Sequence, residues 1–520
     1  MTIYFHATAV AGGLPFCGKN TVKMLIPAGL TLLLAACAVK PEPLDATTIS
    51  SFVTDKTTRL TEGQEKAGHS IDLHEAMARS VKYNLDAKIA AFEELLRVEE
   101  SKLTSMDVLP RLVANSAATS RDSVSSSSSR SVLTGRQSLE PSSSQDRDSV
   151  TGDLSFSYNI LDFGLSYLRA TQAADKTLIA EENRRKVANR IVEDVRTAYW
   201  RAIAGEKLAN RIPAMERRIQ QVQRANASLR ASGQTSPVAA LTFEREVIDL
   251  QREVRRMETE LASARTQLAS LMNLEPGTPF ALVDPTRGRR HLALPGSGPD
   301  MVHAALHNRA EIRDLILQKR INGTEAKAAL LELLPGIQAF VGANMDQNSF
   351  LTKGHWVGWG ARASWNLISL IKYPQKAEVI ASQDRLIDQK ALAATMAVMT
   401  QVYISRVKFH HTGKELAVAD SYSGVQRQLL HQVRSEALAG KVSDQTVLRE
   451  EMNQLIATVR ADLAYANWQN AYASVYASIG VDPYASVISP ETSVKELASQ
   501  IKSSWFENGK LRPGLKLAQR

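Results

Sequence analysis

The sequence predicts a mainly α-helical fold with a small β part, built as two structural repeats of helix, strand, strand and long helical hairpin. Segment 158–161 (Tyr-Asn-Ile-Leu) has a counterpart 207 residues later at 365–368 (Trp-Asn-Leu-Ile). The same offset relates Gly233 to Gly440. A long stretch of helical periodicity follows each copy. One offset kept over so long a block indicates a duplication, so we expect one architecture to be used twice.

The two repeats differ in length at one place. Pro110 matches Pro335 at an offset of 225, so the first repeat is about 18 residues longer between its proline and its second strand. The surplus lies in residues 119–150, which are rich in serine and poor in apolar side chains. Such a segment buries too little to offset its ordering entropy, and we expect a mobile loop there. The matching loop, 347–354, is short.

Four segments alternate between apolar and small or polar residues, which is typical of strands with one wet face. They are 111–119, 154–160, 337–345 and 357–366, and the first of them has the weakest pattern. A strand of about ten residues is also the length that crosses a membrane at a tilt. The pattern therefore fits half-buried soluble strands as well as strands of a membrane barrel.

The remaining sequence predicts very long helices. Residues 166–231 contain a single proline, Pro213, where we expect a kink or a short break. Apolar residues then recur at intervals of three and four, as in a coiled coil. They are Val247, Leu250, Val254, Met257, Leu261, Ala264, Leu268 and Leu271, and Met452, Ile456, Val459, Leu463 and Ala466 repeat the pattern. Helices of this length are expected to pack along each other as hairpins.

The first residues have the features of a secretory signal. Lys19 and Lys23 precede an apolar run, 24–36, that ends in Leu-Ala-Ala before Cys37. This resembles a bacterial lipoprotein signal, in which Cys37 becomes the lipid-bearing first residue. The alternative is a plain signal cleaved at the alanines, with Cys37 incidental. Cys17 would leave with the signal, so no disulfide is expected within the mature chain.

The composition and the motifs point away from several classes of protein. The formal net charge of +9 is modest for 520 residues, and opposite charges alternate along the helices, so we expect no nucleic-acid partner. No catalytic motif is found, and we expect neither an enzyme nor a cofactor. His303 and His307 have a spacing that can hold a metal, but the sequence offers no third ligand nearby except Asp300 and Glu311. The first repeat has Ala78 and Lys82 at the equivalent positions. We therefore expect no metal site.

The order of these elements, doubled behind a lipoprotein signal, resembles the TolC-type outer-membrane factor family. The resemblance covers about residues 70–485 and rests on 76–86, Leu109-Pro110, 158–164 and the two turn-to-helix passages after Gly233 and Gly440. We divide the chain accordingly into a signal peptide (1–36), a lipid-anchored linker (37–69), a first repeat (70–276), an inter-repeat linker (277–299), a second repeat (300–483) and a C-terminal tail (484–520).

The resemblance implies a homotrimer in the outer membrane that extends into the periplasm, with one shared twelve-stranded barrel and a helical tunnel. It implies a passive exit duct of a tripartite efflux or type I secretion system. Its partners would be outer-membrane lipid, a periplasmic adaptor, and an inner-membrane transporter of the proton-driven (RND) or ABC type. Four strands alone cannot close a barrel, which also favours association. The alternative is a lipid-anchored periplasmic coiled-coil adaptor, or a structural protein of an export complex.

The resemblance also suggests which residues act. The hairpin ends of the family close the channel and meet the adaptor, and the matching residues here are Gly233, Pro237, Leu241, Gly440, Asp444 and Leu448. The family often has aspartates shortly after the turn glycine, but this chain has Ala239 and Thr446 there, so an acidic ring is doubtful. Four aromatic residues predict a belt at the membrane interface: Tyr158, Trp356, Trp359 and Trp365.

Overall fold

The computed structural model describes residues 43–275, 277–284, 292–480 and 492–504. The signal peptide and Cys37 lie outside these ranges, as do the last residues of the predicted second repeat, 481–483. The chain divides into two compact units, residues 1–62 and 63–520. The described part of the first unit is one helix, α2 (Ala46–Arg59), whose N-terminus is capped by the Asp45 carboxylate. We expected only a linker there, and no side chain of α2 is buried.

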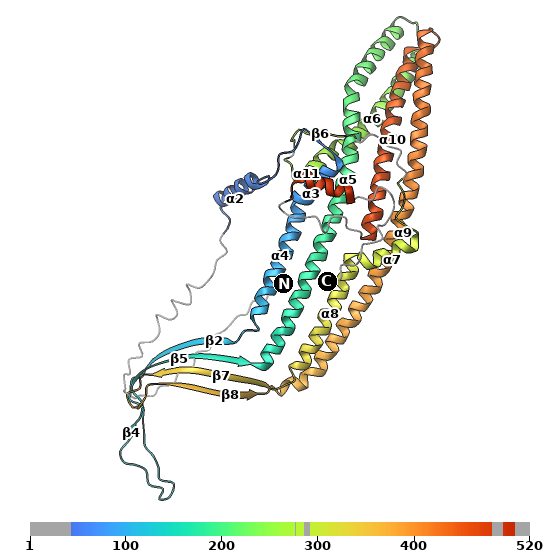
Figure 1. Ribbon diagram of the computed structural model, residues 1–520. Coiled ribbons are helices and arrows are strands. Elements are labelled where there is room, and N and C mark those ends of the chain that lie inside the picture. Colours follow the sequence, from blue (N-terminus) through green and yellow to red (C-terminus); the bar gives the residue numbers. More distant parts are fainter. Residues whose placement is uncertain (1–42, 276, 285–291, 481–491, 505–520) are drawn as a thin grey trace, which may run out of the picture. The chain divides into compact units, whose positions relative to one another are not determined.

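The second unit contains the two predicted repeats (Figure 1). The first repeat consists of α3 (Leu73–Tyr83), α4 (Leu85–Met106), β2 (Arg111–Ser120), β5 (Asp148–Asn159), α5 (Ile160–Ala231) and α6 (Pro237–Leu271). The second consists of α7 (Gly298–Asn308), α8 (Ala310–Leu331), β7 (Gly336–Asp346), β8 (His355–Ser364), α9 (Ile368–Leu438) and α10 (Asp444–Ile479). The predicted repeat of helix, two strands and helical hairpin is confirmed.

The element bounds keep the offsets found in the sequence. Helices α3 and α4 begin and end 225 residues before α7 and α8, without any deviation. Helices α6 and α10 begin 207 residues apart, as do the ends of α5 and α9. The offset changes between the two strands of each repeat, because the loop after β2 is longer than the loop after β7.

The four long strands form one antiparallel sheet in the order β2-β5-β7-β8. The register aligns apolar side chains across the sheet: Leu112 pairs with Phe156, Phe156 with Val341, and Val341 with Trp359. These residues share one face because side chains alternate along a strand. The opposite face carries serine, asparagine and glycine residues. Strands β2 and β8 are the outer strands of this sheet.

The helices continue from the sheet as a layer. Near the strands the order of contacts is α4-α5-α8-α9, and toward the hairpin ends it is α6-α5-α10-α9. In Figure 1 the sheet and the two hairpin ends lie at opposite ends of this unit. Helix α5 has 72 residues and is about 108 Å long. It runs through Pro213 without a break, so the alternative of a break at this residue is wrong.

The predicted coiled-coil seam is confirmed by burial. Val247, Leu261 and Leu268 of α6 are buried, and Met452 and Val459 of α10 are buried in the same way. Leu250, Leu271 and Leu463 are partly covered. Because successive apolar clusters join neighbouring helices along their length, the two hairpins of this unit pack as a four-helix arrangement.

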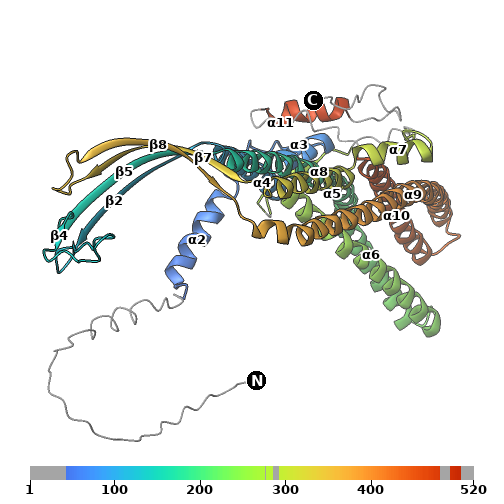
Figure 2. The ribbon, with the colours of Figure 1, turned by 90° about the horizontal axis from the view of Figure 1, so that it is seen from below.

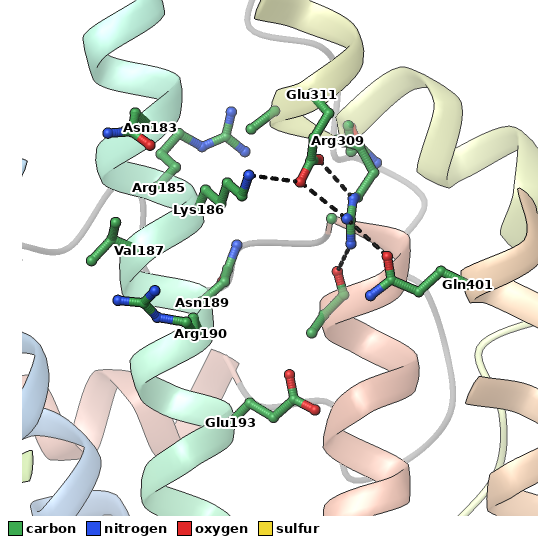
Figure 3. Close-up of a pocket in the computed structure, with 14 residues that line it drawn as sticks. Asn183, Arg185, Lys186, Val187, Asn189, Arg190, Glu193, Arg309, Glu311 and Gln401 are labelled. Carbon is green, nitrogen blue, oxygen red and sulfur yellow. Dashed lines mark hydrogen bonds and ion pairs between the residues drawn. The ribbon is translucent and has the colours of Figure 1, made fainter. Parts of the chain in front are cut away.

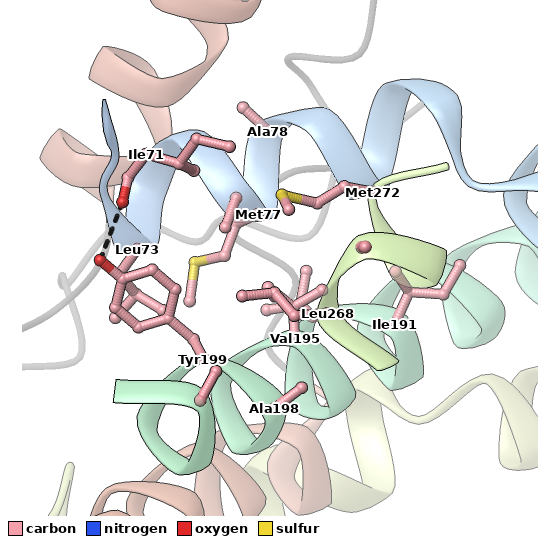
Figure 4. Close-up of a cluster of buried hydrophobic side chains, with 14 of the residues drawn as sticks. Ile71, Leu73, Met77, Ala78, Ile191, Val195, Ala198, Tyr199, Leu268 and Met272 are labelled. Atoms are coloured by element: carbon pink, nitrogen blue, oxygen red, sulfur yellow. Dashed lines mark hydrogen bonds between the residues drawn. The ribbon is translucent and has the colours of Figure 1, made fainter. Parts of the chain in front are cut away.

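The largest apolar cluster lies where α3 and α5 meet, and three of its features were not predicted (Figure 4). A short parallel pair joins β1 (Ser70–Ile71) to β6 (Ala281–Leu282). The Tyr199 hydroxyl donates to Ile71 O at 3.1 Å and lies 2.6 Å from Val283 O, so it ties both strands to α5. The third feature is α11 (Val494–Ser504), which we had assigned to a C-terminal tail.

Helix α11 completes this core by packing on α3, and Figure 2 shows the two helices together beside the long ones. Val494, Leu497 and Ile501 are buried in the cluster. The Glu65 carboxylate accepts hydrogen bonds from Val494 N at 3.1 and 3.2 Å and from Lys82 Nζ at 2.9 Å. The N-terminal end of this unit is thereby fixed to its last described helix.

The serine-rich segment is a folded hairpin, which differs from the expected mobile loop. β3 (Ser126–Ser127) pairs with β4 (Ser142–Ser143), and Arg130 bridges to Gln137. At the base, Asp146 accepts hydrogen bonds from Ser349 N (2.5 Å) and Ser349 Oγ (2.8 Å). Short hydrogen bonds between polar side chains and backbone replace the missing apolar core, which composition alone does not predict.

Candidate docking and gating surface at the hairpin ends

The two hairpin ends have the same turn. Gly233 and Gly440 have φ angles of 71° and 70°, the left-handed region that glycine enters without steric cost. Gly233 N donates to Arg230 O and Gln234 N to Leu229 O, at 3.2 and 3.0 Å. The second turn has the equivalent pair of bonds. This pattern is a Schellman motif, in which the last carbonyls of α5 and α9 are satisfied by the turn.

The helices that leave these turns begin differently. Helix α6 starts at Pro237, and Ser236 makes no side-chain cap there. Helix α10 starts at Asp444, and the Ser443 hydroxyl accepts a bond from Thr446 N. Proline suits the first turn because its missing N–H has no partner there in any case, and an acidic residue suits the positive end of the helix dipole.

The equivalent residues Leu241 and Leu448 have different surroundings. Leu241 is 53% exposed, whereas Leu448 is fully buried with Ile219, Phe243 and Met452. The physical reason is position in the layer: α6 is an outer helix, while α10 lies between α5 and α9. Leu241 is thus available to a partner. Leu448 instead holds the two hairpins together, so its predicted place in a docking surface is not supported.

A charged network joins the first hairpin to the second. The Arg218 guanidinium on α5 forms ion pairs with Asp444 and, at 3.4 Å, with Glu451 of α10. Hydrogen bonding to Asp444 raises the pKa of Arg218, so this side chain stays charged. Arg434 of α9 reaches Glu451 at 2.7 Å. Asp444, predicted as a gate residue, is therefore part of a link between hairpins.

A buried amide reinforces this link. Asn226 of α5 is 1% exposed, and its Nδ2 donates to Ala240 O at 3.3 Å. Its Oδ1 accepts a bond from Gln445 Nε2 at 2.7 Å. A buried amide on α5 that is satisfied by partners on α6 and α10 fixes the relative positions of the three helices, because any shift leaves a polar group unpaired. Neither Arg218 nor Asn226 was predicted. Asn226 continues the buried series of Ile219 and Val222 on α5 at intervals of three and four, where a polar residue is unusual.

The outer helices of the layer carry apolar stripes that are exposed in the part of the chain that the structure describes. On α4 the exposed residues are Ile89, Phe92, Leu96 and Leu103; on α9 they are Leu392, Met396, Val407, Val418 and Val425. Their intervals are three, four, seven or eleven residues, which are close to whole helical turns and place each set along one side of its helix. The stripes occur on the same two sides as the outer strands β2 and β8.

The structure does not place the four aromatic residues of the predicted belt on one face of the sheet. Trp359 (83% exposed) and Tyr158 lie on the apolar face of the sheet. Trp356 pairs with Asn344 and lies on the opposite, polar face, so its place in one belt with Trp359 is wrong. Side chains alternate between the two faces of a strand, so the positions 356 and 359, three residues apart, already predict opposite faces in the sequence. Trp365 follows the end of β8, and its indole N–H donates to Leu333 O at 3.0 Å.

A pocket of about 410 Å³ lies between α5, α10 and the junction of α7 with α8 (Figure 3). Arg309 crosses it, with bonds to Glu311 (3.0 Å), Ala477 O (3.0 Å) and Gln401 (3.1 Å). Burial raises the pKa of the nearby Glu193, and Asp194 adds to this effect. The contacts of Arg309 lie within the second repeat, and Lys186 of α5 joins the first repeat to them through Glu311, at 3.3 Å.

Two further properties concern the described ranges. No helix there is both long and apolar enough to cross a membrane. In the same ranges, no group of three or more His, Cys, Asp or Glu side chains is arranged around a common metal position.

The described chain is thus a four-stranded sheet with two outer edges, continued by a layer of paired helical hairpins. No family model matches the sequence, and no curated protein matches it. Solved structures do match. The outer-membrane channel OprN aligns with 78% of this chain and 89% of its own, at 14% identity and a TM-score of 0.60.

Two other channels agree with this result. The CmeC outer-membrane channel of Campylobacter jejuni aligns with 87% of this chain and 95% of its own, at 11% identity and a TM-score of 0.62. The open state of the MtrE outer-membrane channel of Neisseria gonorrhoeae aligns with 78% of this chain and 88% of its own, at 15% identity and a TM-score of 0.59. The chain therefore has the TolC-type outer-membrane factor fold, and the predicted fold class is confirmed; its trimeric barrel stays a prediction.

Proposed function

We propose that this protein is an outer-membrane channel, a passive exit duct for molecules delivered from the periplasm. The observation that carries the proposal is the sheet β2-β5-β7-β8. Leu112, Phe156, Val341 and Trp359 form an apolar row on one face of this sheet, and the opposite face is polar. A sheet with one apolar and one wet face is what a membrane barrel needs, with lipid outside and water inside.

The proposed assembly is a homotrimer. An open sheet edge in lipid leaves backbone groups without partners, so β2 of one copy must pair with β8 of the next. Three copies give twelve strands, enough for a lumen, whereas two copies give eight, which side chains fill. The apolar stripes of α4 and α9 would meet at the same seams, because they lie on the same sides of the unit as β2 and β8.

The hairpin ends are proposed to close the duct and to bind a periplasmic adaptor. They lie about 100 Å from the sheet along α5. The exposed Leu241 and the turn glycines would supply the surface that binds the adaptor, while the ion pair of Arg218 with Asp444 holds the two hairpins together. Opening of the duct would require these ion pairs to exchange partners. The ion pairs therefore stabilise one specific closed arrangement of the hairpin ends.

The proposed setting is the outer membrane, with Cys37 carrying the lipid anchor and an inner-membrane RND or ABC pump as the energy source. A duct lined by polar and small residues does not select its cargo, so drug efflux and type I secretion both fit. An enzymatic role is not proposed. Mass spectrometry of the mature N-terminus tests the anchor, and an unmodified chain that begins elsewhere would exclude it.

The experiment for the channel is gel mobility of the membrane-extracted protein before and after heating, together with conductance in planar bilayers. A channel gives a heat-labile trimer and discrete conductance steps. A monomer in every detergent, without conductance, would instead favour a coiled-coil adaptor or a structural lipoprotein. An adaptor also has no use for two strand pairs.

A further inference from the structure

We propose that His303 and His307 form a binding site for a divalent transition-metal ion on the exposed face of α7. The two residues lie one helical turn apart, and both side chains face away from the core. Their Nε2 atoms are 3.2 Å apart, and their ring centroids are 4.4 Å apart. This inference does not depend on the proposed channel function.

The distance between the two nitrogen atoms fits a single ion. An imidazole nitrogen binds Zn²⁺ at about 2.0–2.1 Å. Two such bonds to nitrogens 3.2 Å apart enclose an angle of roughly 100° at the metal. That value lies between the right angle of a square-planar site and the tetrahedral angle, so the separation of the two nitrogens fits either geometry. The ion would replace the present hydrogen bond between the two rings.

Helix α7 holds the two rings in place. Met301 and Ala305 on its other face are fully buried in a cluster with Val402 and Tyr472. The helix starts with a capping box between Ser297 and Asp300. A chelate across one turn of a fixed helix needs only side-chain rotamers to be ordered, which reduces the entropy lost on binding.

The surrounding groups define the class of ligand. Two neutral imidazoles favour Cu²⁺, Ni²⁺ or Zn²⁺ over Mg²⁺ or Ca²⁺, with Cu²⁺ bound most tightly. The nearest acids are engaged elsewhere: Asp300 with Ser297, and Glu311 with Arg309 and Lys186. Water or a donor of a second molecule fills the remaining positions, so the ion is exchangeable.

The site is a feature of one repeat only. The equivalent positions on α3 are Ala78 and Lys82, at the offset of 225. The shared helix pair thus supplies the geometry, and two substitutions in the second repeat add the chelating side chains. The sequence led us to expect no metal here because a third ligand is missing, but a two-ligand surface site does not require one.

The test is equilibrium dialysis of the untagged, detergent-purified full chain against Cu²⁺ or Ni²⁺, with Mg²⁺ as the competing hard ion. We expect about one ion per chain, with coupling to imidazole nitrogen in the Cu²⁺ paramagnetic resonance spectrum. The variants His303→Ala and His307→Ala should each weaken binding at least about tenfold, because one of two ligands is lost.

The matched control is the double variant His410→Ala, His411→Ala on α9, whose adjacent side chains lie on different faces and cannot chelate together. It should bind as the unmodified chain does. Circular dichroism verifies that each variant is folded. Equal ion binding by the unmodified chain and His303→Ala would overturn the proposal, as would no binding at all, which would leave only a hydrogen-bonded histidine pair.

Discussion

Leu241 and Leu448 occupy equivalent positions in the two repeats, yet the first is half exposed and the second has no exposed surface. We expect Leu448→Ala to lower the free energy of unfolding by about 2–5 kcal/mol, because it leaves a cavity among Ile219, Phe243 and Met452. Leu241→Ala should change stability by less than about 0.5 kcal/mol but weaken binding of the adaptor. Thermal unfolding and adaptor pull-down separate the two effects. The reverse pattern would show that the hairpin ends are packed differently.

Replacing Gly233 or Gly440 with valine should abolish export while trimers still form. Nothing lies within 4 Å of an added Cβ at either position, so the cost comes from the positive φ alone. That cost is about 1–2 kcal/mol or more for a β-branched residue, enough to distort the turn but not the barrel. Export assays and heat-modified gels give the two readouts.

Gly424→Val is the matched control for these turns. It also has open space around the added side chain, but it lies within α9 with ordinary helical backbone. Export should persist in this variant. Normal export by both turn variants would show that the hairpin ends only connect helices and have no role in docking or gating.

The Arg218→Ala variant should make the closed duct leaky, because Asp444 and Glu451 lose the cation that ties them to the first hairpin. Uptake of large antibiotics that intact outer membranes exclude measures the leak. The exchanged pair Arg218→Asp, Asp444→Arg should restore part of the barrier. As a control, Arg252→Ala breaks an exposed pair within one helix and should have no effect. If the Arg218→Ala variant still excludes these antibiotics, Arg218 does not link the two hairpins in the way assigned here.

The serine-rich hairpin should be dispensable for assembly. Replacing residues 124–143 with an Asn-Gly turn removes β3 and β4 but keeps the clamp of Asp146 on Ser349. Trimers should form in normal yield, since the removed residues contribute no described core contact. A loss of trimer on native gels would mean that the hairpin packs against a neighbouring copy.

Glu193 makes the stability of the fold depend on pH. Its folded-state pKa is raised above the ordinary value of 4.5 by burial, so the folded chain binds this proton more tightly than the unfolded chain. The resulting penalty is absent below the unfolded pKa and grows as the pH rises through the folded pKa. Glu193→Gln should therefore raise the unfolding temperature at pH 8 and leave it unchanged near pH 4. The exposed Glu181→Gln serves as the control. Equal shifts at both pH values would point to a packing effect.

The sequence predicted the repeat, the four strands and the seam, because each depends on local periodicity or on an internal offset. It could not predict that α11 packs on α3, since that contact joins residues more than 400 positions apart. The sequence also could not predict that Leu241 is exposed and Leu448 is buried, because this difference depends on which helix has neighbours on both sides. Trp356 was a different kind of error, since its alternation with Trp359 was visible in the sequence.

The contact between Glu65 and Val494 has a consequence for biosynthesis. A chain made from its N-terminus produces α3 early, but the side of α3 that packs on α11 stays open until Leu497 and Ile501 have been made. A chain that ends before α11 would thus expose this apolar surface to proteases and chaperones. Because this core closes only when α11 is present, the fold itself separates chains that carry this helix from fragments that lack it.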